Sequence, residues 1–306
     1  MLIDVAVSVL LFLLVALVSG NNLVACSGSI ISGRLVKKST GIAIAVLGYI
    51  AGLYFQGGLL GRSIIALMPY RSPALVLLAF AVANIIFIIA HRFRVPQSLS
   101  ISFASILVGV SLASGRNVDM RFIALMLAFW VIGSFLSMGV SFFATRASKK
   151  IPAKGIWAKL RVIRLAAIAT AFLTAFTLGA NTFGFLYASV PSSGYYFAVV
   201  VVAIILGSAF LSGGELRRMG NEIMPLRYID TINTQVSSMI AVEIGTLLGI
   251  PISNTQTYTS SIYGAGIGYK SRLLLKRPLV AIVSTWLLVA FIGFAVAFAS
   301  AYLLLH

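Results

Sequence analysis

The sequence predicts an all-α polytopic membrane protein built from two inverted repeats of five passages each. Three observations predict this fold. The mean hydropathy is +1.06, and 9% of the residues are charged, against about a quarter in soluble domains. Apolar runs of roughly 20 residues, enough to cross a hydrocarbon core of about 30 Å, recur along the whole chain. Two polar motifs also occur twice, at nearly the same offset.

The apolar runs define ten passages, within about 10–12 expected for the complete fold. Because each half holds an odd number, the second half enters the membrane upside down. We expect an N-terminal repeat over residues 1–143, a basic cytoplasmic linker over 144–164 and an inverted C-terminal repeat over 165–306. The predicted passages are 5–20, 41–60, 73–91, 98–115, 121–143, 165–180, 194–212, 230–250, 253–268 and 279–304.

The net charge of +17 indicates topology rather than a nucleic-acid partner. If both termini are external, alternate loops hold 19 of the 23 Lys and Arg residues. The positive-inside rule then places these loops in the cytoplasm. The segment 144–164 carries seven of these bases, and attraction of an anionic substrate or lipid is its alternative interpretation. We therefore expect a multi-pass protein of the plasma membrane, in contact with the lipid bilayer.

The clearest internal repeat aligns "PQSLSISFASILVG", residues 96–109, with "PISNTQTYTSSIYG", residues 251–264. Prolines, hydroxyl residues and the final glycine coincide at a constant offset of 155. A second pair, "GNN" at 20–22 and "GAN" at 179–181, has an offset of 159. Inverted repeats with polar breaks at matching places are typical of secondary transporters. The sequence therefore predicts a transporter.

Each polar segment predicts a broken or re-entrant passage that lines a cavity, because lipid offers no hydrogen bonds to irregular backbone. The proline and the alternating hydroxyls favour an extended stretch, with a helix beginning near Ser105 and Ser260. Unpaired N–H groups at a helix start and neutral side-chain donors suit a divalent oxyanion. Alternatively, each hydroxyl bonds back to its own helix. The residues predicted to bind substrate are Asn21, Asn22, Ser98, Ser100, Ser102, Asn181, Thr182, Ser253, Asn254, Thr255, Gln256 and Thr257.

These motifs resemble those of the inorganic phosphate transporter (PiT) family, which carries duplicated GANDxxN signatures and a G[LI]PVSTTHT-like segment. Here "GNNLVAC" and "GANTFGF" stand at the first signature and "GIPISNTQT" at the last, while "RRMGNEIMPL", residues 217–226, is similar to the approach to it. The resemblance implies an inverted-repeat bundle with external termini and a mid-membrane site. It also implies ion-coupled uptake of inorganic phosphate, and a homodimer is possible by analogy.

Both signature aspartates are replaced, by Leu23 and Thr182, and the later asparagines by Cys26 and Phe185. The resemblance associates those acids with cation coupling, so the coupling ion stays open between proton and sodium. A site without carboxylates favours sulfate, which only accepts hydrogen bonds, over hydrogen phosphate, which also donates one. Phosphate is slightly favoured by the family, and a proton-coupled sulfate permease, as in a similar branch of that family, is the alternative.

Glu243 is the candidate group for proton coupling. It lies in an apolar passage, eight residues before Pro251, where a lone ionisable group is costly and by default functional. The alternative is a glutamate that pairs with a base or reaches the interface.

Other classes of protein fit less well. The chain has one cysteine and two histidines and lacks an HExxH motif, so we expect no enzyme, metal site or cofactor. A passive anion channel is the remaining alternative, because a channel can use the same donors with weaker binding.

Overall fold

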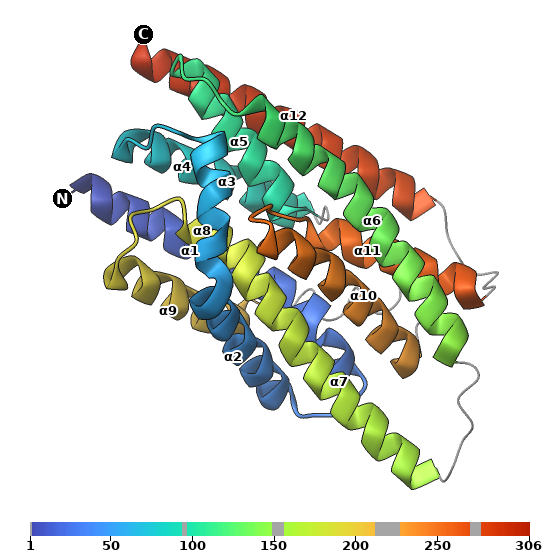
Figure 1. The fold of residues 1–306 in the computed structure, drawn as a ribbon. Helices are drawn as coiled ribbons and strands as arrows, with labels where there is room; N and C mark the ends of the chain where they lie inside the picture. Colours follow the sequence, from blue (N-terminus) through green and yellow to red (C-terminus); the bar gives the residue numbers. More distant parts are fainter. Residues whose placement is uncertain (1, 94–96, 149–155, 212–226, 270–276) are drawn as a thin grey trace.

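The computed structural model describes the chain except for residues 1, 94–96, 149–155, 212–226 and 270–276. Every regular element of the described residues is helical, as Figure 1 shows. The predicted all-α membrane fold is confirmed, and each predicted passage coincides with a helix. The elements are α1 (Leu2–Ser32), α2 (Lys38–Gln56), η1 (Gly57–Leu60), α3 (Gly61–Leu67), α4 (Pro73–Phe93), α5 (Leu99–Ala113), α6 (Met120–Ser148), α7 (Ile156–Leu178), η2 (Gly179–Phe183), α8 (Gly184–Tyr187), α9 (Gly194–Phe210), α10 (Tyr228–Leu247), α11 (Asn254–Tyr269) and α12 (Arg277–Leu305).

Length and composition separate the helices into an apolar group and a polar pair. Six spans of the described chain are long and apolar enough to cross a membrane, while α5 and α9 are apolar but shorter. On α6 and α12, large side chains such as Phe135, Phe143, Phe291 and Leu303 are exposed, as expected of a surface that faces lipid. The pair α10 and α11 is rich in hydroxyl and amide groups, and the two helices pack against each other and against α6.

The packing of the helices follows the predicted repeat. α6 packs along α11 as α12 packs along α5, and α1 packs along α9 as α7 packs along α2. In the repeat alignment α5 corresponds to α11, α6 to α12 and α1 to α7, so each contact has its counterpart in the other half. Segments more than a hundred residues apart therefore lie side by side, such as α5 with α12 and α6 with α11 (Figure 1). This arrangement agrees with a pseudo-two-fold relation between the halves.

The helices α5 and α11 begin earlier than expected. The prediction of an extended stretch up to Ser105 and Ser260 is wrong, because α5 begins at Leu99 and α11 at Asn254. The serine before each helix acts as its cap: its Oγ accepts a hydrogen bond from the N–H three residues later, at 3.4 Å and 3.2 Å. Such caps stabilise a helix start by about 1 kcal/mol. Both helices nevertheless begin within the polar segments where the sequence predicts a break.

The asparagine motifs also differ from expectation. The first passage does not end at "GNN", because α1 continues as one helix through residues 20–22 to Ser32. In the second half, "GAN" forms the π-helical turn η2 between α7 and α8. A π turn carries one extra residue per turn and occurs frequently at functional sites.

Some predicted segments lie wholly or partly outside the described residues. These are Pro96, the motif at 217–226 and the middle of the predicted linker. α6 runs to Ser148 and α7 begins at Ile156, so both helices reach into the interval 144–164. The division into two repeats and a linker stays a prediction.

Candidate functional site

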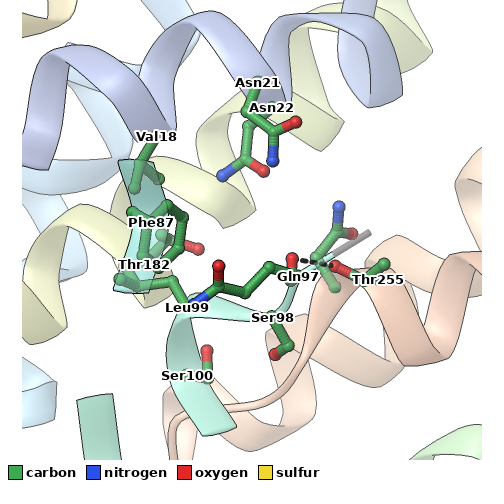
Figure 2. A pocket seen from close by; sticks show the side chains of 11 residues that line it. Val18, Asn21, Asn22, Phe87, Gln97, Ser98, Leu99, Ser100, Thr182 and Thr255 are labelled. Carbon is green, nitrogen blue, oxygen red and sulfur yellow. Dashed lines mark hydrogen bonds between the residues drawn. The ribbon is translucent and has the colours of Figure 1, made fainter. Parts of the chain in front are cut away.

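A small polar cavity lies where the starts of α5 and α11 meet α1 and η2. Figure 2 shows Asn21 and Asn22 on one side of it, with Gln97, Ser98 and Thr255 opposite. Seven of the residues predicted to bind substrate are on its wall, and its described lining carries no charged side chain. The lining residues are Val18, Asn21, Asn22, Phe87, Gln97, Ser98, Leu99, Ser100, Thr182, Asn254 and Thr255.

Two reciprocal hydrogen bonds join the two helix starts. Ser100 Oγ donates to the carbonyl oxygen of Ile252 at 2.9 Å, and Thr255 Oγ1 donates to that of Gln97 at 3.3 Å. The donors are 155 residues apart, as are the acceptors, so the second bond repeats the first under the repeat alignment. The two polar segments therefore meet, as the sequence predicted.

The helix starts supply donors for an anion. The capping serines bind only one N–H each, and helix geometry leaves the preceding N–H groups of the first turn without a partner inside the helix. The dipoles of α5 and α11 place partial positive charge at the same ends. Backbone N–H groups at a helix N-terminus are a common binding site for phosphate and sulfate. Two such ends beside one cavity suit a doubly charged oxyanion.

Side-chain amides and hydroxyls complete the polar lining. The side chains of Asn22 and Thr182 make no hydrogen bond to the described chain, so both groups are available to a ligand. Asn254 Oδ1 accepts a hydrogen bond from Ser238 Oγ at 3.2 Å, which leaves the NH₂ group of Asn254 as a donor. Because these donors are neutral, they can hold an anion without the strong binding of a buried Lys or Arg.

The cavity is narrow. The centre of a water molecule has about 10 Å³ in which to move, which is close to the minimum for one bound water. An oxyanion with four oxygens is larger than a water molecule, so the walls of the cavity must move outwards to admit the anion. The cavity can therefore be a binding site only if helix starts or side chains rearrange during the cycle.

Gln97 was not predicted and belongs to the cavity. Its Nε2 donates to Ser102 Oγ at 3.0 Å, while its Oε1 is buried without a hydrogen-bond partner. The repeat alignment concealed it, because its counterpart in the second half is the apolar Ile252. The available signal was an amide directly before the hydroxyl run.

Four predicted residues of the polar segments do not line the cavity and bond to their own helices instead. Ser102 and Thr257 hydroxyls bond to carbonyl oxygens four residues earlier, at 2.8 Å and 3.3 Å, the pattern of the alternative interpretation. Ser253 caps α11. Gln256 donates its N–H to that cap and has a buried Oε1 without a partner.

Asn181 supports the site from behind. Its Nδ2 donates to Thr246 Oγ1 at 2.9 Å and to the carbonyl of Ile250 at 3.2 Å, and its Oδ1 accepts from the N–H of Ile252 at 3.0 Å. Asn181 is fully buried and lies next to Thr182, which reaches the cavity. It fixes the chain between α10 and α11 and does not line the cavity.

The "GIP" part of "GIPISNTQT" determines how the chain leaves α10 and reaches Asn181. Gly249 has φ +70°, a conformation that a side chain disfavours. With the hydrogen bonds of the Gly249 and Ile250 N–H groups to Thr246 and Gly245, at 2.9 Å and 2.8 Å, it forms a Schellman motif. The motif ends α10 and sends Pro251–Ser253 past Asn181 to the start of α11.

Glu243 lies apart from the cavity lining. It is half-buried on α10, where its Oε1 accepts a hydrogen bond from Gln56 Nε2 at 2.8 Å. The alternative of pairing with a base is not observed in the described part of the chain, where the ion pair joins Arg227 and Asp230.

Fold and cavity together define a multi-pass helical membrane transporter with a central anion-compatible site. The chain belongs to the phosphate transporter family, because residues 19–297 match the model of that family. This confirms the family predicted from the motifs. Its family and fold are those of transporters, which are not enzymes.

Relatives and a solved structure cover nearly the whole chain. A Methanocaldococcus jannaschii protein, named as a phosphate permease, is 22% identical over 94% of this chain and 93% of its own. A sulfate permease of Bacillus subtilis is 20% identical over 87% of this chain and 78% of its own. A solved sodium-dependent phosphate transporter shares the fold with a TM-score of 0.84, at 17% identity and 99% coverage of both chains.

Proposed function

We propose that the protein is an ion-coupled secondary transporter for a tetrahedral oxyanion, with inorganic phosphate as its first substrate. The observation that carries this proposal is the pair of capped helix starts, bonded reciprocally through Ser100 and Thr255 beside a neutral cavity. The donors bind the anion's oxygens, and rearrangement of the two repeats exposes it to each side in turn. Membership of the phosphate transporter family supports phosphate.

Gln97 also favours phosphate. Hydrogen phosphate carries a proton that needs an acceptor, and Gln97 Oε1 is a buried acceptor without a partner. Because sulfate at neutral pH has no proton to give, it gains nothing from this oxygen. We expect Gln97→Met, which removes the acceptor at similar size, to reduce the preference for phosphate over sulfate.

Sulfate is the second candidate substrate. The described residues of the cavity wall include no carboxylate, which would repel a fully ionised dianion. One of the relatives is named a sulfate permease. The two candidates differ in their need for an acceptor, so direct competition separates them.

Counterflow in proteoliposomes tests the proposal. Vesicles loaded with unlabelled phosphate, diluted into labelled phosphate and held at zero membrane potential, should accumulate label above equilibrium, which a passive channel cannot do without a potential. Unlabelled phosphate should compete better than sulfate, and the reverse order would assign sulfate. Absence of saturable exchange with either anion would refute the transporter proposal.

For location we propose the plasma membrane, with both termini external and the basic segment 144–164 in the cytoplasm. Figure 1 supports this: both termini lie at one end of the bundle, while the starts of α2 and α7 and the end of α6 lie at the other. Lys37, Lys38 and Arg146 are at that second end, as the positive-inside rule requires. Labelling of introduced cysteines with an impermeant reagent tests the orientation. A homodimer is proposed from the family resemblance, and light scattering of the detergent-solubilised protein tests it.

A further inference from the structure

Glu243 and Gln56, both half-buried, form an incompletely bonded pair between α10 and the end of α2. Gln56 Nε2 donates to Glu243 Oε1 at 2.8 Å, and the other two oxygens, Glu243 Oε2 and Gln56 Oε1, are both buried without a partner. A buried carboxylate oxygen and a buried amide oxygen without donors are each costly. One O–H group on the carboxyl would supply the donor that this pair lacks.

We propose that this Glu243–Gln56 pair is the proton-binding site that couples transport. The inference rests on the proposed function and identifies its coupling ion. A proton from the external side adds to the carboxylate, forming an O–H bond and changing its charge from −1 to 0. After the conformational change, the same O–H bond breaks and the proton leaves to the cytoplasm, so one proton accompanies each anion.

The helices that carry the pair, α2 and α10, both pack against the π turn η2. Thr246, one helical turn after Glu243 on α10, accepts the hydrogen bond from Asn181 of η2. Gly57, directly after Gln56, lies so close to Gly184 that a Cβ on Gly57 would be 3.3 Å from its Cα. Since Thr182 of η2 lines the cavity, η2 connects the helices of the pair to one cavity wall.

The surroundings hold few charges that compete for this carboxyl. α10 packs against α1, α6, α7, α11, η1 and η2, and within their described residues η1 and η2 carry none. Arg62 of α3 packs against Gly249, beyond the end of α10. The described charged or titratable residues on the packed helices are Asp4 and Cys26 on α1, Arg121 and Arg146 at the two ends of α6, Arg161 and Arg164 at the start of α7, and Tyr258, Tyr263 and Tyr269 on α11.

A proton fits this pair better than a sodium ion does. A hard cation needs several oxygen ligands at once, whereas the pair offers two unpartnered oxygens. In the described part of the chain, acidic, cysteine and histidine residues do not gather into a metal-binding group. The test therefore also includes a sodium gradient.

The test uses purified full-length protein in proteoliposomes and labelled phosphate. Wild type should accumulate phosphate at least tenfold better with an inward proton gradient than without one, and a sodium gradient should add less than twofold. Glu243→Gln, which imitates the protonated acid, should lose the proton stimulation and retain counterflow exchange. Asp119→Asn is the matched control, because Asp119 caps α6 away from the pair and asparagine caps equally well; its proton stimulation should be unchanged.

A second variant and a spectrum make the outcome decisive. Gln56→Met removes the donor to the carboxylate, so the pH dependence of the stimulation should change while exchange persists. Infrared difference spectra of wild type between acidic and alkaline pH should show a carboxylic acid band that is absent in Glu243→Gln. Full proton stimulation in Glu243→Gln, stimulation of wild type by sodium alone, or no change in that band would overturn the coupling site. Failure of wild type to exchange either anion would instead overturn the proposed function.

Discussion

The two repeats carry the same asparagine at the same place and use it differently. Asn181 is fully buried and makes three hydrogen bonds, to Thr246, Ile250 and Ile252. Asn22 is partly exposed at the cavity and makes none to the described chain. The backbone differs too, since α1 is an uninterrupted helix there and η2 is a π turn.

The helix starts show the opposite behaviour, because their bonding is repeated almost atom for atom. The caps, the back-bonded hydroxyls and the reciprocal pair through Ser100 and Thr255 all recur at an offset of 155. The symmetric part of the site is therefore its backbone frame. The asymmetric part is the asparagine motif that faces this frame. Its asparagine is held by hydrogen bonds in the second half and is available to a ligand in the first half.

The largest expected effect separates the two asparagines by stability. Asn181→Ala leaves the buried N–H of Ile252 and the carbonyl of Ile250 without this partner, while the Thr246 hydroxyl loses one donor and keeps its bond to Val242. Each unsatisfied buried group costs about 1–3 kcal/mol, non-additively. We expect a loss of at least about 3 kcal/mol, seen as a lower thermal midpoint in detergent. Asn22→Ala should change the same midpoint by less than about 0.5 kcal/mol. Equal losses in both variants would contradict the distinction.

The matched glycines of α5 and α11 give the next largest effect. An added Cβ at Gly264 would contact the carbonyl oxygen of Met138 on α6, and one at Gly109 would lie 2.6 Å from that of Phe294 on α12. Both contacts require backbone movement, and that at Gly264 is the closer. Overpacking of this kind costs typically about 1–3 kcal/mol, so Gly264→Ala should lower the midpoint more than Gly109→Ala does. The reverse order would contradict the closer approach of the two helices at Gly264.

Transport, rather than stability, should respond to Asn22. Losing one neutral donor to an anion costs about 1.5 kcal/mol, which is about tenfold in affinity. Asn22→Ala should therefore raise the KM for phosphate about tenfold at an unchanged thermal midpoint, measured as initial uptake in proteoliposomes. An unchanged KM would remove Asn22 from the binding site and leave the cavity's other side to bind the anion alone.

The sequence predicted the helices and the meeting of the two polar segments because both depend on local pattern. Apolar length sets a passage, and the repeat alignment pairs Ser98–Ser102 with Ser253–Thr257 at one offset. The start of each helix was misplaced because hydroxyls two residues apart fit an extended strand as well as a cap followed by back-bonded side chains. Only the hydrogen bonds of the folded chain distinguish an extended strand from a capped helix, and the sequence does not show those bonds.

The different duties of Asn22 and Asn181 could not be predicted for a related reason. They depend on a π turn in one half and a continuous helix in the other, and neither has a strong local signature. Gln97 was missed because candidate residues were chosen by their polar counterparts in the other repeat, and the counterpart of Gln97 is apolar. A functional residue that breaks a repeat needs the three-dimensional cavity to be found.

The smallest expected effects concern the reciprocal bonds, where the two halves are most alike. Ser100→Ala and Thr255→Val each remove one such bond, worth about 1 kcal/mol, with Ser100 the more costly because its bond is shorter, 2.9 Å against 3.3 Å. Either bond alone still holds the two helix starts together. The double variant should therefore lose about 0.5 kcal/mol or more beyond the sum of the single losses, as interacting neighbours do. A double-mutant cycle on thermal unfolding measures this coupling, and strict additivity would mean that the helix packing, not the paired bonds, keeps the frame closed.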